Sequence, residues 1–210
     1  MSYRQRLAAA APGKETVVTI GVFDGVHQGH RHLLRQVVEL AGDQYVPTVV
    51  TFSNRPITVL RPGTEPSYLT TLDQRIDLIK EQGIQTVISL EFTLELAQVT
   101  APDFADGLSE SLMMKGLILG PDSAVGKDRQ GDLAFMQQQG EQLGFWARSV
   151  DTLEIEGQPV KSRRIREAVA SGNLEVCPGL LGRNHTLSGV VVVGDQRGRT
   201  LGFPTANIDV

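Results

Sequence analysis

Two histidines, His27 and His30, stand in a segment whose composition suits phosphate binding, since residues 21–32 read GVFDGVHQGHRH. The segment separates an expected buried strand, Thr16–Ile20, from an expected helix that begins near residue 28. Residues three apart lie on one face of a helix, so both imidazoles should face the same ligand. The free N–H groups at a helix N-terminus attract anions, and glycines allow the backbone to approach a ligand closely. The spacing therefore predicts a phosphate site at this turn.

A cluster of cations marks a second candidate phosphate site, because residues 160–166 read VKSRRIR. The cluster begins an expected helix whose apolar side includes Ile165 and Val169. An exposed cation at a helix N-terminus opposes the helix dipole by about 0.3 to 1 kcal/mol, so a cluster there indicates a compensating anion. A polyphosphate is the simplest anion of this kind.

Short β-branched runs alternate with helical patterns along the chain, which is typical of a parallel sheet covered on both faces. We expect an α/β fold with an open, doubly wound, Rossmann-like sheet over about residues 14–160. Ligands of such sheets bind beyond the carboxyl ends of the strands, which is where the two histidines lie. The expected strands are Thr16–Ile20, 48–52, Thr86–Leu90, 117–120 and 145–147, and the expected helices cover 28–41, 72–79, 102–112 and 133–143.

The composition of the 210-residue chain argues against several function classes. Its 20 Lys and Arg residues stand against 24 Asp and Glu, and a net charge of −4 does not suit a nucleic-acid partner. The one cysteine, Cys177, cannot form an internal disulfide, so a reducing, cytoplasmic location is expected. The apolar runs are too short for a signal peptide or a transmembrane helix, so no membrane partner is expected. The sequence leaves the oligomeric state open.

Spacing excludes two common nucleotide-binding motifs. Residues 120–128 read GPDSAVGKD, with five residues between the glycines and Asp128 after the lysine. A P-loop has four residues at that place and Ser or Thr after the lysine. No G-x-G-x-x-G follows the first strand, which argues against a hydride-transferring dinucleotide enzyme.

The segment GVFDGVHQGH resembles the first signature of the nucleotidylyltransferase superfamily, which binds the ATP phosphates at an HxGH turn. More narrowly, it resembles the bacterial FAD synthetases, the bifunctional riboflavin kinase/FMN adenylyltransferases. Their second signature, Ser or Thr followed by Ile-Arg, is similar to Ser162, Ile165 and Arg166, although Lys161 and Arg163 replace small hydroxyl residues. The resemblance implies that the catalytic residues are His27, His30, Ser162 and Arg166, and that the other ATP-binding residues are Gly21, Val22, Phe23, Asp24, Gly29, Lys161 and Arg163.

Two further stretches resemble the flavin side of that family. TFSNRPITVL follows the second strand, with Asn54 and Arg55 in place of the family's Pro-His. GPDSAVGKDRQGD, at residues 120–132, resembles the flavin-side loop, with Ser123 and Val125 where aromatic residues are usual. Aromatic contacts contribute about 0.5 to 1.5 kcal/mol beyond their area, so their loss would loosen stacking on the flavin ring. The flavin-binding residues that the resemblance implies are Arg55, Asp122, Gly126, Lys127 and Arg129.

Residues 181–210 resemble the opening of the riboflavin kinase barrel, most specifically at GFPTAN, whose Thr205 and Asn207 would help hold Mg-ATP in a complete kinase. The resemblance implies an adenylyltransferase domain over 14–182 and a kinase fragment over 183–210, with kinase activity only in a full-length form. The apolar run 190–193 should expose unpaired strand backbone. We therefore expect residues from about 185 onward to be poorly ordered or to pair with another chain.

The resemblance implies that FMN attacks ATP, giving FAD and pyrophosphate. Mg²⁺ would bridge phosphate oxygens and keep several waters, and no protein metal ligand is assigned. Two alternatives stay open. Another nucleotidylyltransferase, acting on a pantetheine, nicotinate or glycerol phosphate, would share the HxGH turn but would not explain the kinase-like end. A flavin- or nucleotide-binding protein that has lost turnover would account for the departures at Arg55, Ser123, Val125 and Arg163.

Overall fold

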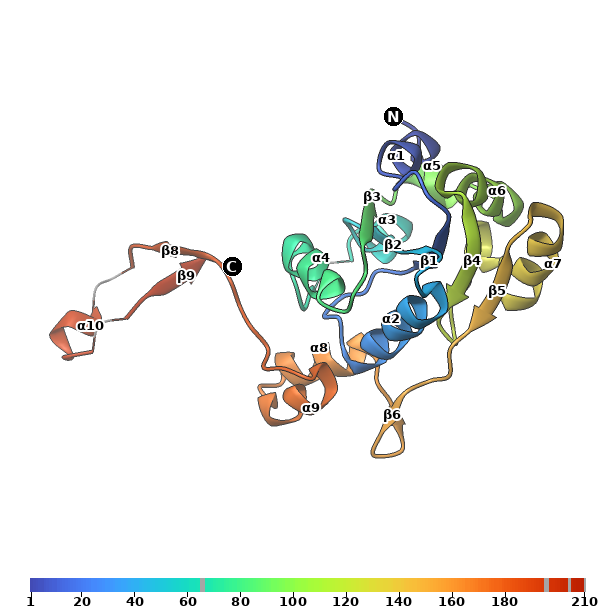
Figure 1. The fold of residues 1–210 in the computed structure, drawn as a ribbon. Coiled ribbons are helices and arrows are strands. Elements are labelled where there is room, and N and C mark those ends of the chain that lie inside the picture. The colour runs from blue at the N-terminus through green and yellow to red at the C-terminus, as the bar shows by residue number, and fades with distance from the viewer. Residues whose placement is uncertain (65–66, 195–196, 204, 210) are drawn as a thin grey trace.

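A five-stranded parallel sheet forms the centre of the protein in a computed structural model (Figure 1). The structure describes residues 1–64, 67–194, 197–203 and 205–209. The sheet order is β3-β2-β1-β4-β5, and each neighbouring pair is parallel. The expected doubly wound α/β class is confirmed. The strands are β1 (Thr16–Ile20), β2 (Val46–Phe52), β3 (Thr86–Leu90), β4 (Met114–Leu119) and β5 (Trp146–Ser149).

The direction of chain progress across the sheet reverses at β1. The chain moves outward from β1 through β2 and β3 and then returns to place β4 on the other side of β1. Val18 accordingly pairs with Thr48 of β2 and with Leu117 of β4. Such a reversal opens a crevice beyond the carboxyl ends of the flanking strands, because their connections leave in opposite directions. All of β1 is buried because helices cover both faces of the sheet. Its sequence, TVVTI, is therefore a continuous run of Val, Ile and Thr without alternating charged residues.

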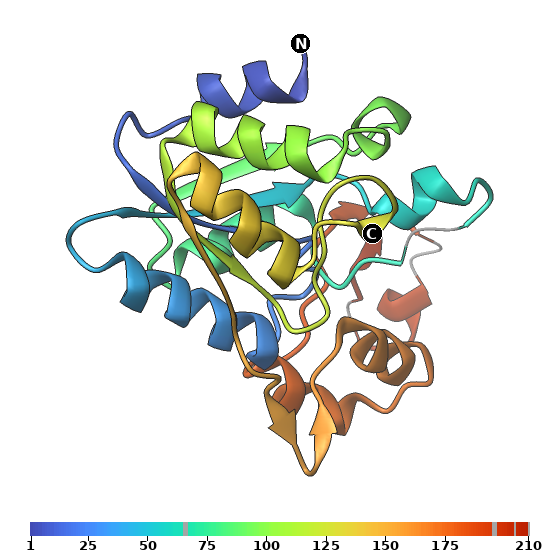
Figure 2. The same ribbon diagram turned by 90° about the vertical axis from the view of Figure 1, so that its right-hand side faces the viewer.

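Helices cover both faces of the sheet (Figure 2). Neighbouring residues of β1 point into two different cores. Val18 lies in a first core with α1, α6 and α7, whereas Val17 lies in a second core with α2 and α4. The helices are α1 (Tyr3–Ala9), α2 (Gln28–Ala41), α3 (Pro56–Leu60), α4 (Leu72–Lys80), α5 (Leu94–Ala97), α6 (Ala101–Leu112), α7 (Leu133–Leu143), α8 (Ser162–Ala170), α9 (Cys177–Leu181) and α10 (Arg197–Thr200), with 3-10 turns η1 (Lys127–Arg129) and η2 (Leu174–Val176).

Some element boundaries differ from the sequence-based expectations. β4 begins at Met114, because Met113 ends α6 in the left-handed conformation (φ 48°) and the chain enters the sheet at once. β5 starts at Trp146, which pairs with Gly116, where a side chain would overlap the indole ring. Helix α1 was not expected, and it forms because Leu7 is fully buried in the first core.

The segment after β5 forms a small cap beside the sheet. It contains the short hairpin β6 (Glu154–Ile155) and β7 (Gln158–Pro159), followed by α8 and α9. Helices α8 and α9 form a third core in which Ile165 and Leu181 pack with Leu69 and Val160. This packing brings the N-terminus of α8 to the same cleft as the N-terminus of α2.

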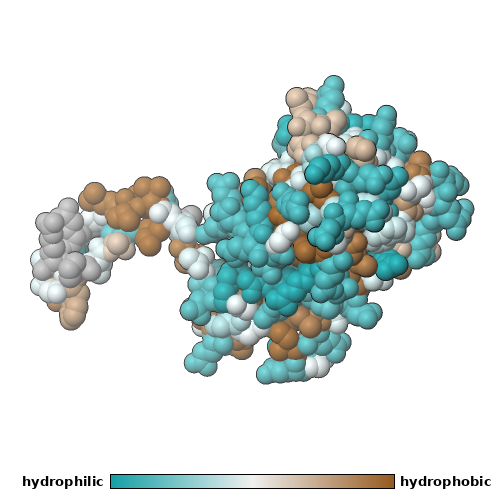
Figure 3. Space-filling model, in the orientation of Figure 1, coloured by the Kyte–Doolittle hydropathy of each residue, from teal (hydrophilic) through white to brown (hydrophobic). Residues whose placement is uncertain are grey.

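The C-terminal residues form an arm that extends from the body (Figure 1). β8 (Val190–Val192) pairs antiparallel with β9 (Asn207–Asp209), so the expectation of a strand without a neighbour is wrong. The last residue of GFPTAN and the two residues that follow it supply the partner strand. Both strands are exposed, and apolar side chains gather over this arm (Figure 3). Pro204 of the motif lies outside the described residues.

Across the described ranges, no helix combines the length and the apolar character that crossing a membrane requires.

Candidate active site

A cleft of about 430 Å³ lies beyond the carboxyl ends of β1, β2, β4 and β5. Its walls include the first turns of α2 and α8, so unpaired N–H groups of two helices border the same space. Both helix dipoles present their positive ends there, which favours an anionic ligand. The predicted site residues that line the cleft are Gly21, Val22, Phe23, Asp24, His27, Gly29, His30, Arg55, Asp122, Lys161, Ser162 and Arg166.

The turn between β1 and α2 has an unusual backbone. Phe23, Gly25 and Val26 have φ values of 53°, 81° and 38°. A β-branched residue rarely adopts a positive φ, so the turn stores strain that the surrounding packing must offset. Phe23 and Val26 are buried in the second core, and a side chain at Gly25 would overlap Leu69. Buried contacts therefore hold the histidine-bearing turn in one conformation.

His27 is the N-cap of α2, and its imidazole is buried. Its Nδ1 atom accepts a hydrogen bond of 3.2 Å from the backbone N–H of His30. A neutral imidazole that accepts at Nδ1 carries its proton at Nε2, so His27 keeps one N–H to donate. Burial, followed by the positive charge of Arg166, lowers the pKa of His27 to about 4. The side chain is therefore a neutral hydrogen-bond donor at neutral pH.

His30 stacks on His27, with ring centroids 3.6 Å apart and ring planes 16° from parallel. The ring of Phe23 contacts it edge-on at a centroid distance of 5.2 Å. Burial, His27 and the charge of Arg75 hold the pKa of His30 well below its usual value. Its Nδ1 atom is buried and has no hydrogen-bond partner in the part of the chain that the structure describes. Two neutral imidazoles thus lie together on one wall of the cleft.

Gly29 allows the segment before α8 to approach the first turn of α2. A Cβ atom at Gly29 would lie 3.2 Å from the carbonyl oxygen of Val160 and 3.3 Å from the ring of His27. These distances are tight for a side chain held between backbone and a buried ring. The absence of a side chain at Gly29 therefore allows the N-termini of α2 and α8 to lie close together. The contact of Gly29 with the nucleotide stays a prediction.

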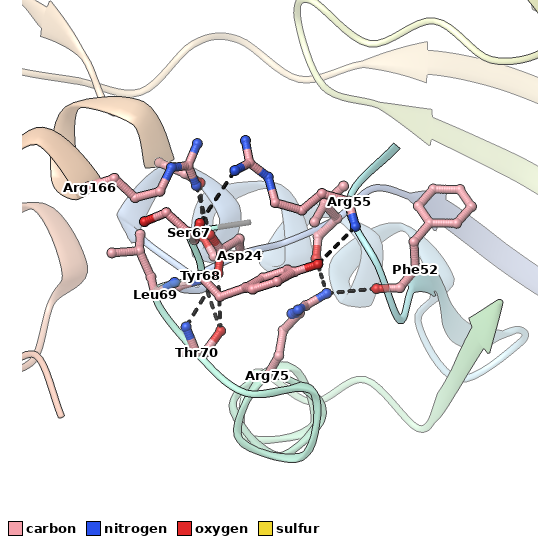
Figure 4. Close-up of polar contacts among 12 residues, drawn as sticks. Asp24, Phe52, Arg55, Ser67, Tyr68, Leu69, Thr70, Arg75 and Arg166 are labelled. Atoms are coloured by element: carbon pink, nitrogen blue, oxygen red, sulfur yellow. Dashed lines mark hydrogen bonds and ion pairs between the residues drawn. The ribbon is translucent and has the colours of Figure 1, made fainter. Parts of the chain in front are cut away.

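Asp24 joins three segments of the chain at one side of the cleft (Figure 4). Its Oδ1 accepts hydrogen bonds from the backbone N–H groups of Leu69 (2.9 Å) and Thr70 (3.3 Å). Its Oδ2 forms an ion pair of 2.7 Å with Arg166, and its backbone oxygen accepts a hydrogen bond of 2.9 Å from Ser162 Oγ. The buried carboxylate has both oxygens engaged, and it fixes α8 against the turn.

Arg55, Lys161 and Arg166 bring positive charge to the cleft. The Arg166 side chain is 18% exposed, and burial and the charge of Arg55 lower its pKa. Lys161 forms an exposed ion pair of 2.8 Å with Asp122, and this lysine lowers the pKa of the Asp122 carboxyl. Arg166 is paired with Asp24 and Lys161 with Asp122, so a phosphate at this wall would bind beside both aspartates and share these two cations.

A family model described as FAD synthetase matches residues 10–164. The chain belongs to the FAD synthetase family. A second model, described as riboflavin kinase, matches residues 181–210, which include the C-terminal arm.

Curated relatives of this FAD synthetase family member are described as bifunctional riboflavin kinase/FMN adenylyltransferases. The Escherichia coli K12 protein is 38% identical over 200 residues, which cover 94% of this chain and 64% of the relative. The Pseudomonas fluorescens protein is 36% identical over 196 residues, covering 92% and 63%. The chain therefore spans less than two thirds of the length of these relatives. A Streptococcus pneumoniae crystal structure described as a macrolide-efflux protein matches with a TM-score of 0.88 and 29% identity, covering 97% of this chain and 66% of that one.

Three residues predicted for the flavin side of the site do not line the cleft. Gly126 has a φ of 75°, and a side chain there would overlap the backbone of Ala101, so packing alone requires glycine. Lys127 and Arg129 lie in η1, where Arg129 donates a hydrogen bond to the backbone oxygen of Asp122. Their contacts with a flavin stay predictions.

Three other predicted residues also lie outside the cleft. Arg163 is exposed and pairs with Glu167 one turn further along α8, at 2.8 Å. Thr205 and Asn207 lie on the C-terminal arm, and both are exposed. The role of Arg163 in binding ATP and the roles of Thr205 and Asn207 in holding Mg-ATP stay predictions.

The departures from the family's flavin pattern have identifiable surroundings. Asn54 donates a hydrogen bond to the carbonyl oxygen of Phe92 (2.9 Å) and accepts one from its N–H (2.8 Å). It therefore joins the loops that follow β2 and β3. Ser123 lines the cleft, whereas Val125 is buried in the first core.

Sequence patterns did not indicate Leu69, Thr70 or Arg75. Leu69 and Thr70 bind Asp24 through backbone N–H groups, which carry no side-chain signature. Arg75 is 1% exposed and stands one turn before the buried Ile79 on α4. A cation on the buried face of an amphipathic helix is a signal that could have found it.

The stability of the chain is expected to fall as the pH falls from about 6.5 to 4, because His27 has a folded-state pKa of about 4 against an ordinary 6.5. In that window the imidazole of the unfolded chain binds a proton while the buried ring does not, so the unfolded state is favoured by acid. His27→Asn keeps a good N-cap residue but cannot titrate there. We expect a shallower pH dependence of the free energy of unfolding, measured by urea denaturation. An unchanged slope would contradict the assignment.

Proposed function

We propose that the chain transfers the adenylyl group of ATP to FMN. A phosphate oxygen of FMN forms a bond to the α-phosphorus of ATP as the bond from that phosphorus to the bridging oxygen of pyrophosphate breaks. The products are FAD and pyrophosphate. The observation that carries this proposal is the meeting of His27, His30 and Arg166 with two helix N-termini in one cleft of a FAD synthetase family member.

The side chains of this cleft supply positioning and charge stabilisation. The attacking FMN oxygen is already anionic, so no general base is required, and a covalent intermediate on the protein is not needed. His27 is neutral and caps α2 by accepting at Nδ1, so it donates its Nε2–H to a phosphate oxygen. Arg166 takes the charge that develops on the leaving pyrophosphate. Ser162, whose hydroxyl donates to the backbone of Asp24, positions α8.

Mg²⁺ is proposed to enter this cleft with ATP. The described residues contain no group of three or more His, Cys, Asp or Glu side chains placed to hold a metal ion. Asp24 has both carboxylate oxygens engaged by the protein, so it is poorly suited to be a ligand. These features support a Mg²⁺ that is bound by the ATP phosphates and by water, which is its common mode with nucleotides.

The flavin is assigned to the side of the cleft bordered by Arg55 and Asp122. Both residues follow the carboxyl end of a strand, β2 and β4 respectively. Arg55 is near enough to lower the pKa of Arg166, so a phosphate on this side would lie between two guanidinium groups. The FMN phosphate fits this position because it must meet the α-phosphate of ATP.

The test is to incubate the purified chain with Mg-ATP and FMN and to measure FAD and pyrophosphate. Formation of both in equal amounts, with neither formed when FMN is omitted, is the expected result. Adenylylation of pantetheine, nicotinate or glycerol phosphate compounds without FAD would select another nucleotidylyltransferase. FMN binding without turnover would select a binding protein. The cytoplasmic location stays a prediction from the single cysteine.

A further inference from the structure

Arg75 is the largest of the fully buried side chains in the described chain, and it stands on α4 rather than on either signature segment. Burying a guanidinium is costly unless its charge and N–H groups are satisfied. None of the described carboxylates forms an ion pair with it, although Asp24 attracts it at longer range. Its Nε atom is buried without a hydrogen-bond partner in the described chain. A group this costly requires an explanation beyond core packing.

The guanidinium binds two backbone carbonyl groups next to the cleft (Figure 4). Nη1 of Arg75 donates to the oxygen of Val22 at 3.0 Å and to that of Phe52 at 2.8 Å. Val22 begins the strained turn that carries the histidines, and Phe52 ends β2. Thr51 Oγ1 donates to the same Val22 oxygen at 3.1 Å. These bonds fasten the turn to the end of the neighbouring strand.

Arg75 also supports the loop that carries Arg55. Its guanidinium carbon lies 5.8 Å from the centre of the Tyr68 ring. The hydroxyl of Tyr68 in turn accepts a hydrogen bond of 3.1 Å from the backbone N–H of Arg55. One buried side chain therefore contacts the histidine-bearing turn directly and the Arg55 loop through a single aromatic ring.

We propose that Arg75 is a positioning residue for adenylyl transfer, which sets the β1–α2 turn and the Arg55 loop at the spacing that the two reacting phosphates require. The proposal rests on the proposed function. Electrostatics support it, because the charge of Arg75 acts with burial and His27 to lower the pKa of His30. Phe23, which also packs on His30, carries no charge. Arg75 thus adds to the effect of burial in keeping His30 neutral.

The test compares Arg75→Met, which keeps the length but removes the charge and its donors, with Arg75→Lys, which keeps the charge. The matched control is Arg148→Met, since Arg148 is exposed over Trp146 on β5 and does not line the cleft. For Arg75→Met we expect kcat for FAD formation to fall about tenfold or more, the scale of a misplaced reacting group, with KM much less affected. Arg75→Lys should recover part of kcat.

A second readout is independent of activity. The imidazole NMR signals of His30, followed as pH is lowered, should begin to titrate at higher pH in Arg75→Met than in wild type, because a repelling charge is gone. Arg75→Lys and Arg148→Met should not show this shift. Wild-type kcat in Arg75→Met, or a fall in kcat that Arg148→Met shares, would overturn the proposal. So would failure of both Arg75 variants to fold. A wild-type chain that makes no FAD would refute the proposed function instead, and the NMR comparison would still decide whether Arg75 acts on His30.

Discussion

Replacing His30 with alanine is expected to lower kcat for FAD formation by about 100- to 1,000-fold, the range seen when one preorganised donor to a developing charge is removed. The imidazole lines the cleft, stacks on His27 at 3.6 Å and is held neutral by its surroundings. A neutral ring fixed in this way can donate a hydrogen bond to the reacting phosphate without reorganising during the reaction. Binding of FMN should change much less, because we place the flavin on the Arg55 side.

The matched control for this prediction is His32→Ala on the same helix. His32 does not line the cleft, so its substitution tests whether loss of any imidazole from α2 affects the reaction. Single-turnover rates with Mg-ATP and FMN separate chemistry from product release, and FMN affinity is measured by quenching of flavin fluorescence. Equal losses of rate and FMN affinity in His30→Ala, or equal losses in both variants, would remove His30 from the catalytic role.

The parts of the molecule that sequence predicted well are those determined by local periodicity. Helix α2 was expected at 28–41 and is Gln28–Ala41. Its apolar stripe, including Leu34 and Val37, faces the second core, as the 3.6-residue repeat requires. The position of the HxGH turn at the carboxyl end of β1 followed from the same local pattern, because strand, turn and helix are consecutive in the chain. The family resemblance added the second signature at α8.

The parts that sequence could not predict depend on contacts between distant residues. The Asp24–Arg166 pair spans 142 positions, and the bond from Arg75 to Val22 spans 53. Neither residue type nor spacing shows that these groups meet. The glycine-rich loop at 120–132 illustrates the opposite problem, because its pattern resembled a ligand loop while Gly126 is required by packing against Ala101. Local composition does not distinguish close approach to a ligand from close approach to the protein's own backbone.

The ion pair between Asp24 and Arg166 leads to the largest predicted effect on stability. Asp24→Asn keeps the shape of the side chain and can still accept from Leu69, but it leaves Arg166 without its carboxylate. Removing one partner of a buried pair costs about 3 kcal/mol at the lower end of the usual range, which suits an arginine that is 18% exposed. We expect a loss of this size in the free energy of unfolding, measured by urea denaturation, together with weaker ATP binding.

A double variant distinguishes a lost attraction from a stranded charge. In Asp24→Asn/Arg166→Met the guanidinium that lost its carboxylate is also removed, so the double variant should be more stable than Asp24→Asn alone, although it will not bind ATP well. Glu167→Gln is the control on the same helix, because it breaks the exposed pair with Arg163 and should leave the free energy of unfolding nearly unchanged. The free energies of unfolding lost in Asp24→Asn and in Arg166→Met alone are then compared with the loss in the double variant. If the two losses simply add, the buried charge is not what destabilises Asp24→Asn. The hydrogen bonds of Asp24 to the segment at Leu69 and Thr70 would then hold the turn. The third core and the bond from Ser162 to the Asp24 backbone would hold α8.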